Sequence, residues 1–312
     1  MTMRLGLQSV ATFVPDERYS FLENQNLMHE WDINSEFLKK KTGFLKVARK
    51  PKQYSSSDLA HRAFIQLQKS TPLDPSTIEM IAVVTQNPDC RIPHVSSILQ
   101  DKIGAPETCA AFDISHGCAG YVYGLAITLA FMKEQGMRTG LLFTSDPYSE
   151  IVDPLDRDTA LLFGDASSVT LLSDSPVWEC GKFSFQTDGK LRETLTLKNE
   201  KLRMDGLSVF NFAAKRIPLE IQKVLKLNSF NIEDIDSFLI HSGSRYIVDT
   251  IARRAGLPIE KVPFADENIG NTVSTSIPLL LEKEFSKART LLLSGFGVGL
   301  SSASTVLRRA KL

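Results

Sequence analysis

The chain has 312 residues, of which 43% are hydrophobic and 23% charged, as is ordinary for a globular protein. Its 36 Lys and Arg residues balance 36 Asp and Glu residues, so the charge indicates neither a nucleic-acid surface nor binding to anionic lipid. No apolar run is long enough to cross a bilayer, and the first 14 residues lack the basic-then-apolar pattern of a secretory signal. We therefore expect a cytoplasmic protein that binds neither nucleic acid nor membrane.

The cysteines and histidines indicate neither a disulfide-rich protein nor a metalloprotein. The four cysteines, Cys90, Cys109, Cys118 and Cys180, form no C-x-x-C pair and are too sparse for a disulfide framework. The five histidines are scattered without the spacing of metal ligands, so no metal site is expected.

The hydrophobic pattern predicts alternating strands and helices along the whole chain. Short, nearly all-apolar strands such as residues 78–85 are typical of sheets that are covered on both faces. The expected strands are 4–13, 78–85, 110–114, 140–145, 235–241, 262–265 and 290–294. The expected helices are 20–41, 55–69, 95–103, a helix ending at Gly136, 209–227 with a kink at Pro218, 244–255 and 276–285.

The order of these elements repeats. Residues 78–84 match 235–241, residues 138–143 match 289–294, and Gly117-Cys118 matches Gly270-Asn271 at the corresponding strand-to-helix turn. Such a repeat predicts two α/β halves, residues 1–172 and 173–312. We expect a five-layer α/β/α/β/α sandwich in which two sheets enclose central helices.

Cys118 stands between a predicted buried strand and a long apolar helix. A thiol at the N-terminus of a helix lies near unpaired N–H groups and the positive end of the helix dipole, which lower its pKa and favour the nucleophilic thiolate. Taken alone, however, a cysteine in an apolar segment is more often a small core residue.

The repeat changes this interpretation. A pseudo-twofold axis would bring the N-termini of the two buried helices together, so that Cys118 faces Asn271, with His241 at the end of the matching strand. A nucleophile, a proton or charge handler and an amide donor form a plausible acyl-transfer site. The alternatives are a buried, satisfied His241 and an Asn271 that caps a helix.

Several motifs, in order along the chain, resemble those of the β-ketoacyl-acyl-carrier-protein synthase III family of thiolase-like condensing enzymes. They are DISHGCAGYVYGL at 113–125, DRDTALLFGD at 156–165, TDG at 187–189, MDGLSVF at 204–210, GNTVSTSIP at 270–278 and SGFGVGL at 294–300. The resemblance covers essentially the whole chain and implies the thiolase-like fold.

The resemblance also implies roles. Cys118 would carry the acyl group, while His241 and Asn271 would donate hydrogen bonds to the carbonyl oxygen of a malonyl thioester as CO2 leaves. Backbone N–H groups of Cys118 and Val298 would form the oxyanion hole.

The substrates and partners follow from the same resemblance. Phe37, Lys41 and Arg157 fall where the family binds the adenine and phosphates of coenzyme A. The implied substrates are coenzyme A or phosphopantetheine thioesters, with acyl carrier protein as a partner, no permanently bound cofactor and a homodimeric assembly.

The chain departs from the family pattern around the site, which indicates a specialised homologue. The departures are HSGS at 241–244 for H-Q-A-N, Val298 for glycine, Ser301-Ser302 for Thr-Trp, DAS at 165–167 for D-G-A, His116 for a small residue, and Asn211 and Tyr246 for basic residues.

Two other functions stay open at this point. One is an acyltransferase that passes the acyl group of Cys118 to an alcohol or amine, with His241 as general base. The other is a non-catalytic subunit of a heteromeric synthase, against which the presence of both Cys118 and His241 argues.

Overall fold

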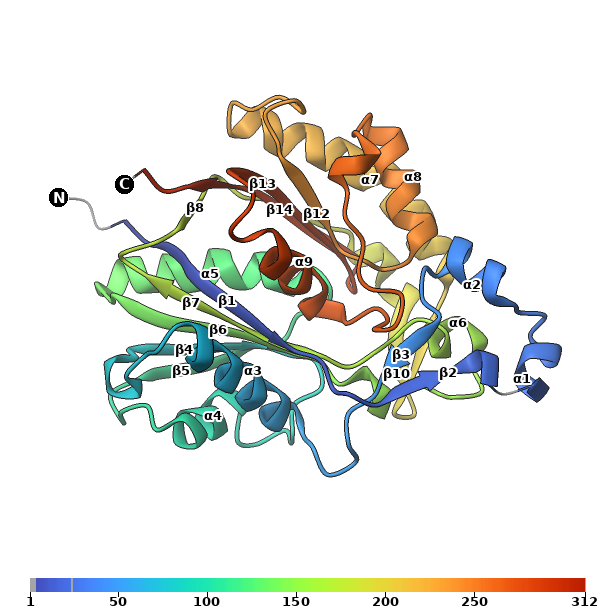
Figure 1. Cartoon of the computed structure of the whole chain (residues 1–312), viewed down its shortest axis with the longest axis horizontal. Helices are drawn as coiled ribbons and strands as arrows, with labels where there is room; N and C mark the ends of the chain where they lie inside the picture. Colours follow the sequence, from blue (N-terminus) through green and yellow to red (C-terminus); the bar gives the residue numbers. More distant parts are fainter. Residues whose placement is uncertain (1–3, 24, 312) are drawn as a thin grey trace.

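A computed structural model describes residues 4–23 and 25–311, and Figure 1 shows its elements. The first half contains β1 (Gly6–Phe13), α3 (Ser56–Ser70), β4 (Met80–Val84), α4 (Val95–Ile103), β5 (Ala110–Ile114), α5 (Gly120–Gln135), β6 (Thr139–Ser145) and β7 (Ser167–Ser173). The second half contains β8 (Trp178–Cys180), β9 (Ser184–Thr187), α7 (Gly206–Leu227), β12 (Ser237–Ile240), α8 (Arg245–Ala255), α9 (Ser276–Glu284), β13 (Thr290–Gly297) and β14 (Ser301–Arg309).

Smaller elements gather at one end of the molecule. They are β2 (Arg18–Ser20), α1 (Gln25–Glu30), α2 (Ser35–Lys41), β3 (Lys46–Ala48), α6 (Arg157–Ala160), β10 (Leu195–Lys198) and β11 (Lys201–Met204). Short 3-10 turns complete the chain at Phe21–Glu23, Pro75–Thr77, Tyr148–Glu150, Gly189–Thr194, Ile259–Lys261 and Val273–Thr275.

The strands form two half-sheets that β8 connects. The strand order is β12-β13-β14-β8-β1-β7-β6-β4-β5, with β9 paired to β14. In the first half β4 is parallel to β5 and β6, and in the second half β12 is parallel to β13. The strand β5 lies at the edge of its sheet.

The hydrophobic core confirms the five layers. One cluster lies between the two half-sheets and includes α5 and α9, for example Val122, Leu125 and Ile277. A second cluster packs α3 and α4 against the first half-sheet, and a third packs α7 and α8 against the second. Figure 1 shows α5 and α9 between the upper and lower strands. The apolar character of α5 therefore follows from its central position.

The topology agrees with the predicted repeat. The matched segments 78–84 and 235–241 become β4 and β12, and each is parallel to the strand that forms from its second matched segment, β6 or β13. The helix α7 runs continuously through Pro218.

Two expected elements differ. Residues 262–265 form no strand, and Pro263 in this segment lacks the N–H that a sheet ladder requires. The expected helix 20–41 is interrupted, because Asn34 begins α2 by accepting a hydrogen bond from the backbone N–H of Phe37.

Within residues 4–23 and 25–311, no helix is long and apolar enough to cross a membrane. The same residues contain no group of three or more His, Cys, Asp or Glu side chains that could hold a metal ion.

Candidate active site

One cavity of about 800 Å³ collects nearly all the predicted site residues. Cys118 comes from the first half, and His241 and Asn271 come from the second. The mouth of the cavity is formed by residues of α2 and α6 that are at least partly exposed. The predicted residues on its wall are Phe37, Lys41, Cys118, Arg157, His241 and Asn271. Val298 does not line the cavity, but its neighbour Gly297 does. The residues are thus brought together from five separate parts of the sequence.

The segment between β5 and α5 places the thiol of Cys118 two residues before the helix begins. The side chain is 4% exposed, and backbone hydrogen bonds from Cys118 itself and from Val298 reach it. The hairpin that carries Val298 packs closely on the sulfur, since a Cβ added at Gly297 would lie 2.8 Å from Sγ. Glycine is therefore required at position 297. The two N–H groups predicted for an oxyanion hole both lie beside the sulfur.

The pKa of Cys118 contradicts the sequence-based expectation of a lowered value. Burial raises the pKa of the thiol to about 12, and the nearby carboxyl of Asp146 contributes to this rise. The two backbone hydrogen bonds lower the pKa but do not offset burial. With this pKa, the side chain of Cys118 is a neutral thiol at neutral pH, not a thiolate.

Asp146 is a residue that sequence analysis missed. It follows β6 directly, is fully buried, and accepts hydrogen bonds from the backbone N–H of Gln86 at 2.7 Å and from the hydroxyl of Ser274. Burial raises the pKa of Asp146 to about 6. Its position at the carboxyl end of a predicted buried strand was the available signal. Because Ser274 belongs to the second half, its hydrogen bond to Asp146 connects the two halves close to Cys118.

Backbone contacts with the L-F-G-D motif fix Asn271. Its N–H donates to the carbonyl of Leu162 at 2.7 Å, and its carbonyl accepts from the N–H of Gly164 at 3.0 Å. This approach requires Gly164, because a Cβ there would lie 2.0 Å from the carbonyl oxygen of Ile269. Phe163 is buried, contacts Tyr148 and also lines the cavity.

The amide of Asn271 is oriented by its neighbours. Its Oδ1 accepts a hydrogen bond from the N–H of Val273 at 2.9 Å, while Nδ2 donates to the carbonyl of Gly243 at 3.4 Å. The capping role weighed as an alternative is thus present, since Val273 begins a 3-10 turn. It uses the oxygen and leaves the second Nδ2–H available to a ligand.

His241 follows β12 and is 2% exposed. Its Nδ1 lies 2.6 Å from the hydroxyl of Ser276, a second residue that sequence analysis missed. Its ring is nearly perpendicular to that of Phe296, with ring centres 5.3 Å apart. Burial lowers the pKa of His241 to about 3, although a hydrogen bond with the backbone of Val273 opposes this shift. The imidazole is therefore neutral at physiological pH.

Two pairs of cationic and aromatic side chains stand at the mouth of the cavity. The guanidinium of Arg157 lies 5.0 Å from the centre of the Phe37 ring, and the ammonium of Lys41 lies 4.4 Å from the centre of the Tyr246 ring. Phe210 stacks on Tyr246 at 5.2 Å. Tyr246, where the family often has arginine, thus contacts the predicted phosphate-binding lysine.

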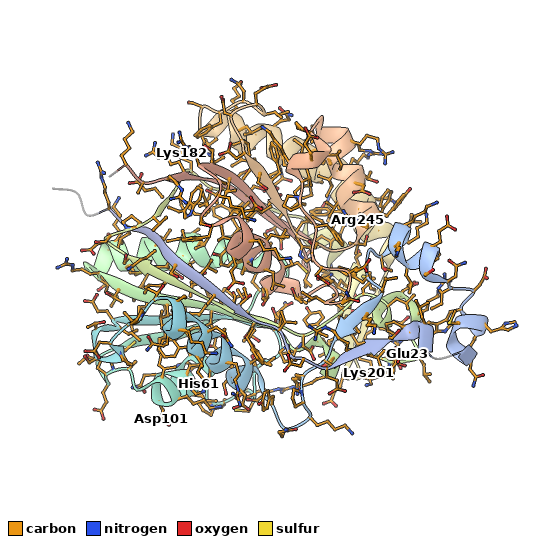
Figure 2. The ribbon with its side chains drawn as sticks, in the orientation of Figure 1. Glu23, His61, Asp101, Lys182, Lys201 and Arg245 are labelled. Carbon is orange, nitrogen blue, oxygen red and sulfur yellow. The ribbon has the colours of Figure 1, made fainter. Side chains whose placement is uncertain are left out.

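The helices α2 and α8 meet at this mouth. The N–H of Arg245 donates to the carbonyl of Thr42 at 2.9 Å, and Figure 2 labels Arg245 at the start of α8, beside the end of α2. The Arg245 guanidinium lies over the Phe264 ring at 4.1 Å.

Comparison with known proteins agrees with this geometry. Residues 112–189 match the sequence profile described as 3-oxoacyl-[acyl-carrier-protein] synthase III, and residues 225–309 match the profile of its C-terminal part. The chain is 30% identical to a β-ketoacyl-[acyl-carrier-protein] synthase III of Halalkalibacterium halodurans, with 98% of each chain covered.

Solved structures show the same similarity. A 3-oxoacyl-(acyl-carrier protein) synthase of Burkholderia xenovorans superposes with a TM-score of 0.90 at 29% identity, covering 100% of this chain and 95% of that one. The β-ketoacyl-[acyl carrier protein] synthase III of Thermus thermophilus gives a TM-score of 0.90 at 26% identity, with 98% and 100% covered. The chain therefore belongs to the 3-oxoacyl-[acyl-carrier-protein] synthase III family, whose members are transferases.

Proposed function

We propose that this protein condenses an acyl thioester with a malonyl thioester, releasing CO2 and forming a β-ketoacyl thioester through an acyl-Cys118 intermediate. The observation that carries the proposal is the meeting of Cys118, His241 and Asn271 on one cavity, with the Asn271 amide held so that its nitrogen can donate. Family membership supports the same reaction.

The first step transfers the acyl group. The sulfur of Cys118 attacks the thioester carbonyl, the new C–S bond forms, and the departing thiol takes the proton that Cys118 loses. The backbone N–H groups of Cys118 and Val298 stabilise the negative charge that develops on the oxygen. These amides are fixed by the fold before the substrate binds.

The second step forms the new C–C bond. The bond between the malonyl carboxylate and its neighbouring carbon breaks, CO2 leaves, and the electron pair becomes an enolate. His241 and Asn271 donate hydrogen bonds to the enolate oxygen. The enolate carbon then attacks the acyl carbonyl, the bond to sulfur breaks, and the released thiolate of Cys118 takes a proton from the solvent.

The low basicity of His241 disfavours transfer to an alcohol or amine. A general base works best when its pKa lies near the operating pH, and that of His241 is lowered to about 3. A neutral imidazole can still act as a hydrogen-bond donor, which is the role that condensation requires.

We assign the mouth of the cavity to the nucleotide part of coenzyme A. Phe37 and Arg157 offer an aromatic face and a flat cation to a purine ring, and Lys41 offers charge to phosphates. Acyl carrier protein would approach the same mouth with its phosphopantetheine arm. The substrates are thioesters, and no permanently bound cofactor is part of the proposal.

We further propose a cytoplasmic homodimer whose subunits pair along β5. This strand is at the sheet edge, its residues are half-buried, and Phe112 on it packs against Phe131 at 5.5 Å. Ile92, on the loop after β4, is 87% exposed and would be covered by a second copy. Within each subunit, residues 1–172 and 173–312 form the proposed halves.

Mass spectrometry of the intact protein tests the first step. Incubation with a panel of acyl thioesters should add one acyl mass, which Cys118→Ala abolishes and the matched control Cys180→Ala retains, because Cys180 lies outside the cavity. An adduct that persists in Cys118→Ala, or no adduct with any thioester, contradicts the proposal.

Malonyl carrier protein tests the second step. Added to the acyl-enzyme, it should release CO2 and give a β-ketoacyl product. Transfer of the acyl group to an alcohol or amine without CO2 release would establish the alternative acyltransferase.

A further inference from the structure

His116, two residues before the nucleophile, has no role in the proposed reaction and does not line the cavity. Its ring stacks on Tyr123 of α5, with centres 4.3 Å apart and planes inclined by 25°. Its Nε2 lies 3.5 Å from the hydroxyl of Ser301. The ring therefore reaches from the nucleophile segment of the first half to the start of β14 in the second.

Ser301 closes the hairpin that carries Val298. Gly297 and Ser301 pair across β13 and β14, and the Ser301 hydroxyl donates to the carbonyl of Val298 at 2.7 Å. The backbone N–H of Val298 lies close enough to Cys118 to lower the pKa of the thiol. One peptide segment thus presents its N–H to the reaction centre while its carbonyl is held by Ser301.

The proton positions follow from these contacts. Ser301 has one hydroxyl proton, and the carbonyl of Val298 takes it, so the Ser301 oxygen can only accept from His116. Neutral His116 then carries its proton on Nε2. Its Nδ1 is buried and has no hydrogen-bond partner among the described residues. His116 therefore donates its Nε2–H to Ser301 and connects the segment before Cys118 with the start of β14.

We propose that His116 is a positioning residue that fixes the distance between the two oxyanion N–H groups. One group belongs to Cys118, two residues from His116, and the other to Val298, three residues from Ser301. The contact of 3.5 Å is long in the free enzyme, and such bonds tighten when charge develops in the site. The inference rests on the proposed acyl transfer to Cys118.

Two substitutions separate the hydrogen bond from the ring stack. His116→Phe keeps an aromatic ring on Tyr123 and removes the donor, whereas His116→Gln keeps an N–H near the position of Nε2. We expect His116→Phe to lower the rate of Cys118 acylation by an acyl thioester about tenfold, since small displacements of catalytic groups are costly. His116→Gln should restore most of the rate, and the KM for the thioester should change less than twofold in both.

Alkylation of Cys118 by iodoacetamide is the companion measurement. It involves no oxyanion, so its rate should be the same in His116→Phe as in the unmodified protein, which also shows that the variant is folded. Ser301→Ala should slow acylation similarly, and the double variant His116→Phe/Ser301→Ala no further than Ser301→Ala alone, because both act through one contact.

The outcomes distinguish the inference from the function on which it rests. Equal acylation rates for His116→Phe and the unmodified protein overturn the positioning role, as do equal losses in the Phe and Gln variants. Equal slowing of alkylation and acylation would mean that His116 acts on the thiol itself. Failure of the unmodified protein to form any acyl-Cys118 overturns the proposed function instead.

Discussion

The two junctions that lead into the central helices α5 and α9 hold chemically different groups. At the first, Cys118 lies among apolar neighbours, above the buried carboxyl of Asp146. At the second, Asn271 accepts a hydrogen bond from Val273, and His241, which follows β12, lies against Ser276 at the start of α9. One half therefore supplies the proposed nucleophile, and the other half supplies the oriented polar groups. A duplicated fold can divide two successive chemical steps between its copies.

The largest expected effect concerns the thiol at the first junction. With its pKa raised to about 12, the thiolate fraction of Cys118 should grow tenfold per pH unit, about a thousandfold between pH 7 and pH 10. The iodoacetamide alkylation rate, followed by peptide mass spectrometry at Cys118, measures this. A plateau below pH 8 would show that the helix N-terminus dominates, as the sequence predicts.

At the second junction we expect Asn271→Asp to slow condensation by about a hundred- to a thousandfold, since it removes one N–H donor and adds negative charge where the enolate forms. Acylation of Cys118 should continue at close to its normal rate. Single-turnover measurement of each step decides this. If acylation falls as much as condensation, the two junctions do not divide the steps as proposed.

Two buried ionisable groups, His241 and Asp146, should change the stability of the protein in opposite directions as the pH falls. The lowered pKa of His241, about 3, makes stability rise with pH between about 3 and 6.5, because the unfolded state binds the proton more readily. The raised pKa of Asp146, about 6, makes stability fall with pH between about 3.8 and 6. Each contributes a slope of about 1.4 kcal/mol per pH unit, and the two slopes partly cancel.

Removing either group should expose the slope of the other. In urea titrations between pH 4 and 6, stability of Asp146→Asn should rise with pH relative to the unmodified protein, and that of His241→Gln should fall. Parallel profiles for all three proteins would contradict the assigned shifts, whatever the absolute stabilities of the variants.

The smallest expected effect is at the mouth. Phe37→Ala should raise the KM for an acyl-coenzyme A about three- to tenfold, because it removes the aromatic face that Arg157 also contacts. Neither kcat nor the KM for an acyl-pantetheine that lacks the nucleotide should change. An equal rise in KM for both substrates would place the nucleotide elsewhere.

The sequence by itself determined the architecture and the chemical groups. Five layers could be predicted from short all-apolar strands, helices ended by glycine and two matching series of elements. Strands that are buried on both faces are almost entirely apolar, so their sequences are easily distinguished. Cys118, His241 and Asn271 could be selected because each belongs to a repeated segment of the sequence. The segment around Pro263 was wrongly predicted as a strand, because the hydrophobic pattern does not show that proline lacks the N–H that a strand donates.

Tertiary structure decided how these groups behave. The predicted low pKa of Cys118 relied on the local helix N-terminus, whereas the value is governed by the desolvation that both half-sheets and Asp146 impose together. Likewise, only the fold brings His241 to Ser276 and His116 to Ser301, because these residues are distant in the chain. The fold also orients the amide of Asn271 toward the N–H of Val273. Local sequence fixes which groups are present; burial and long-range contacts fix their charge and direction.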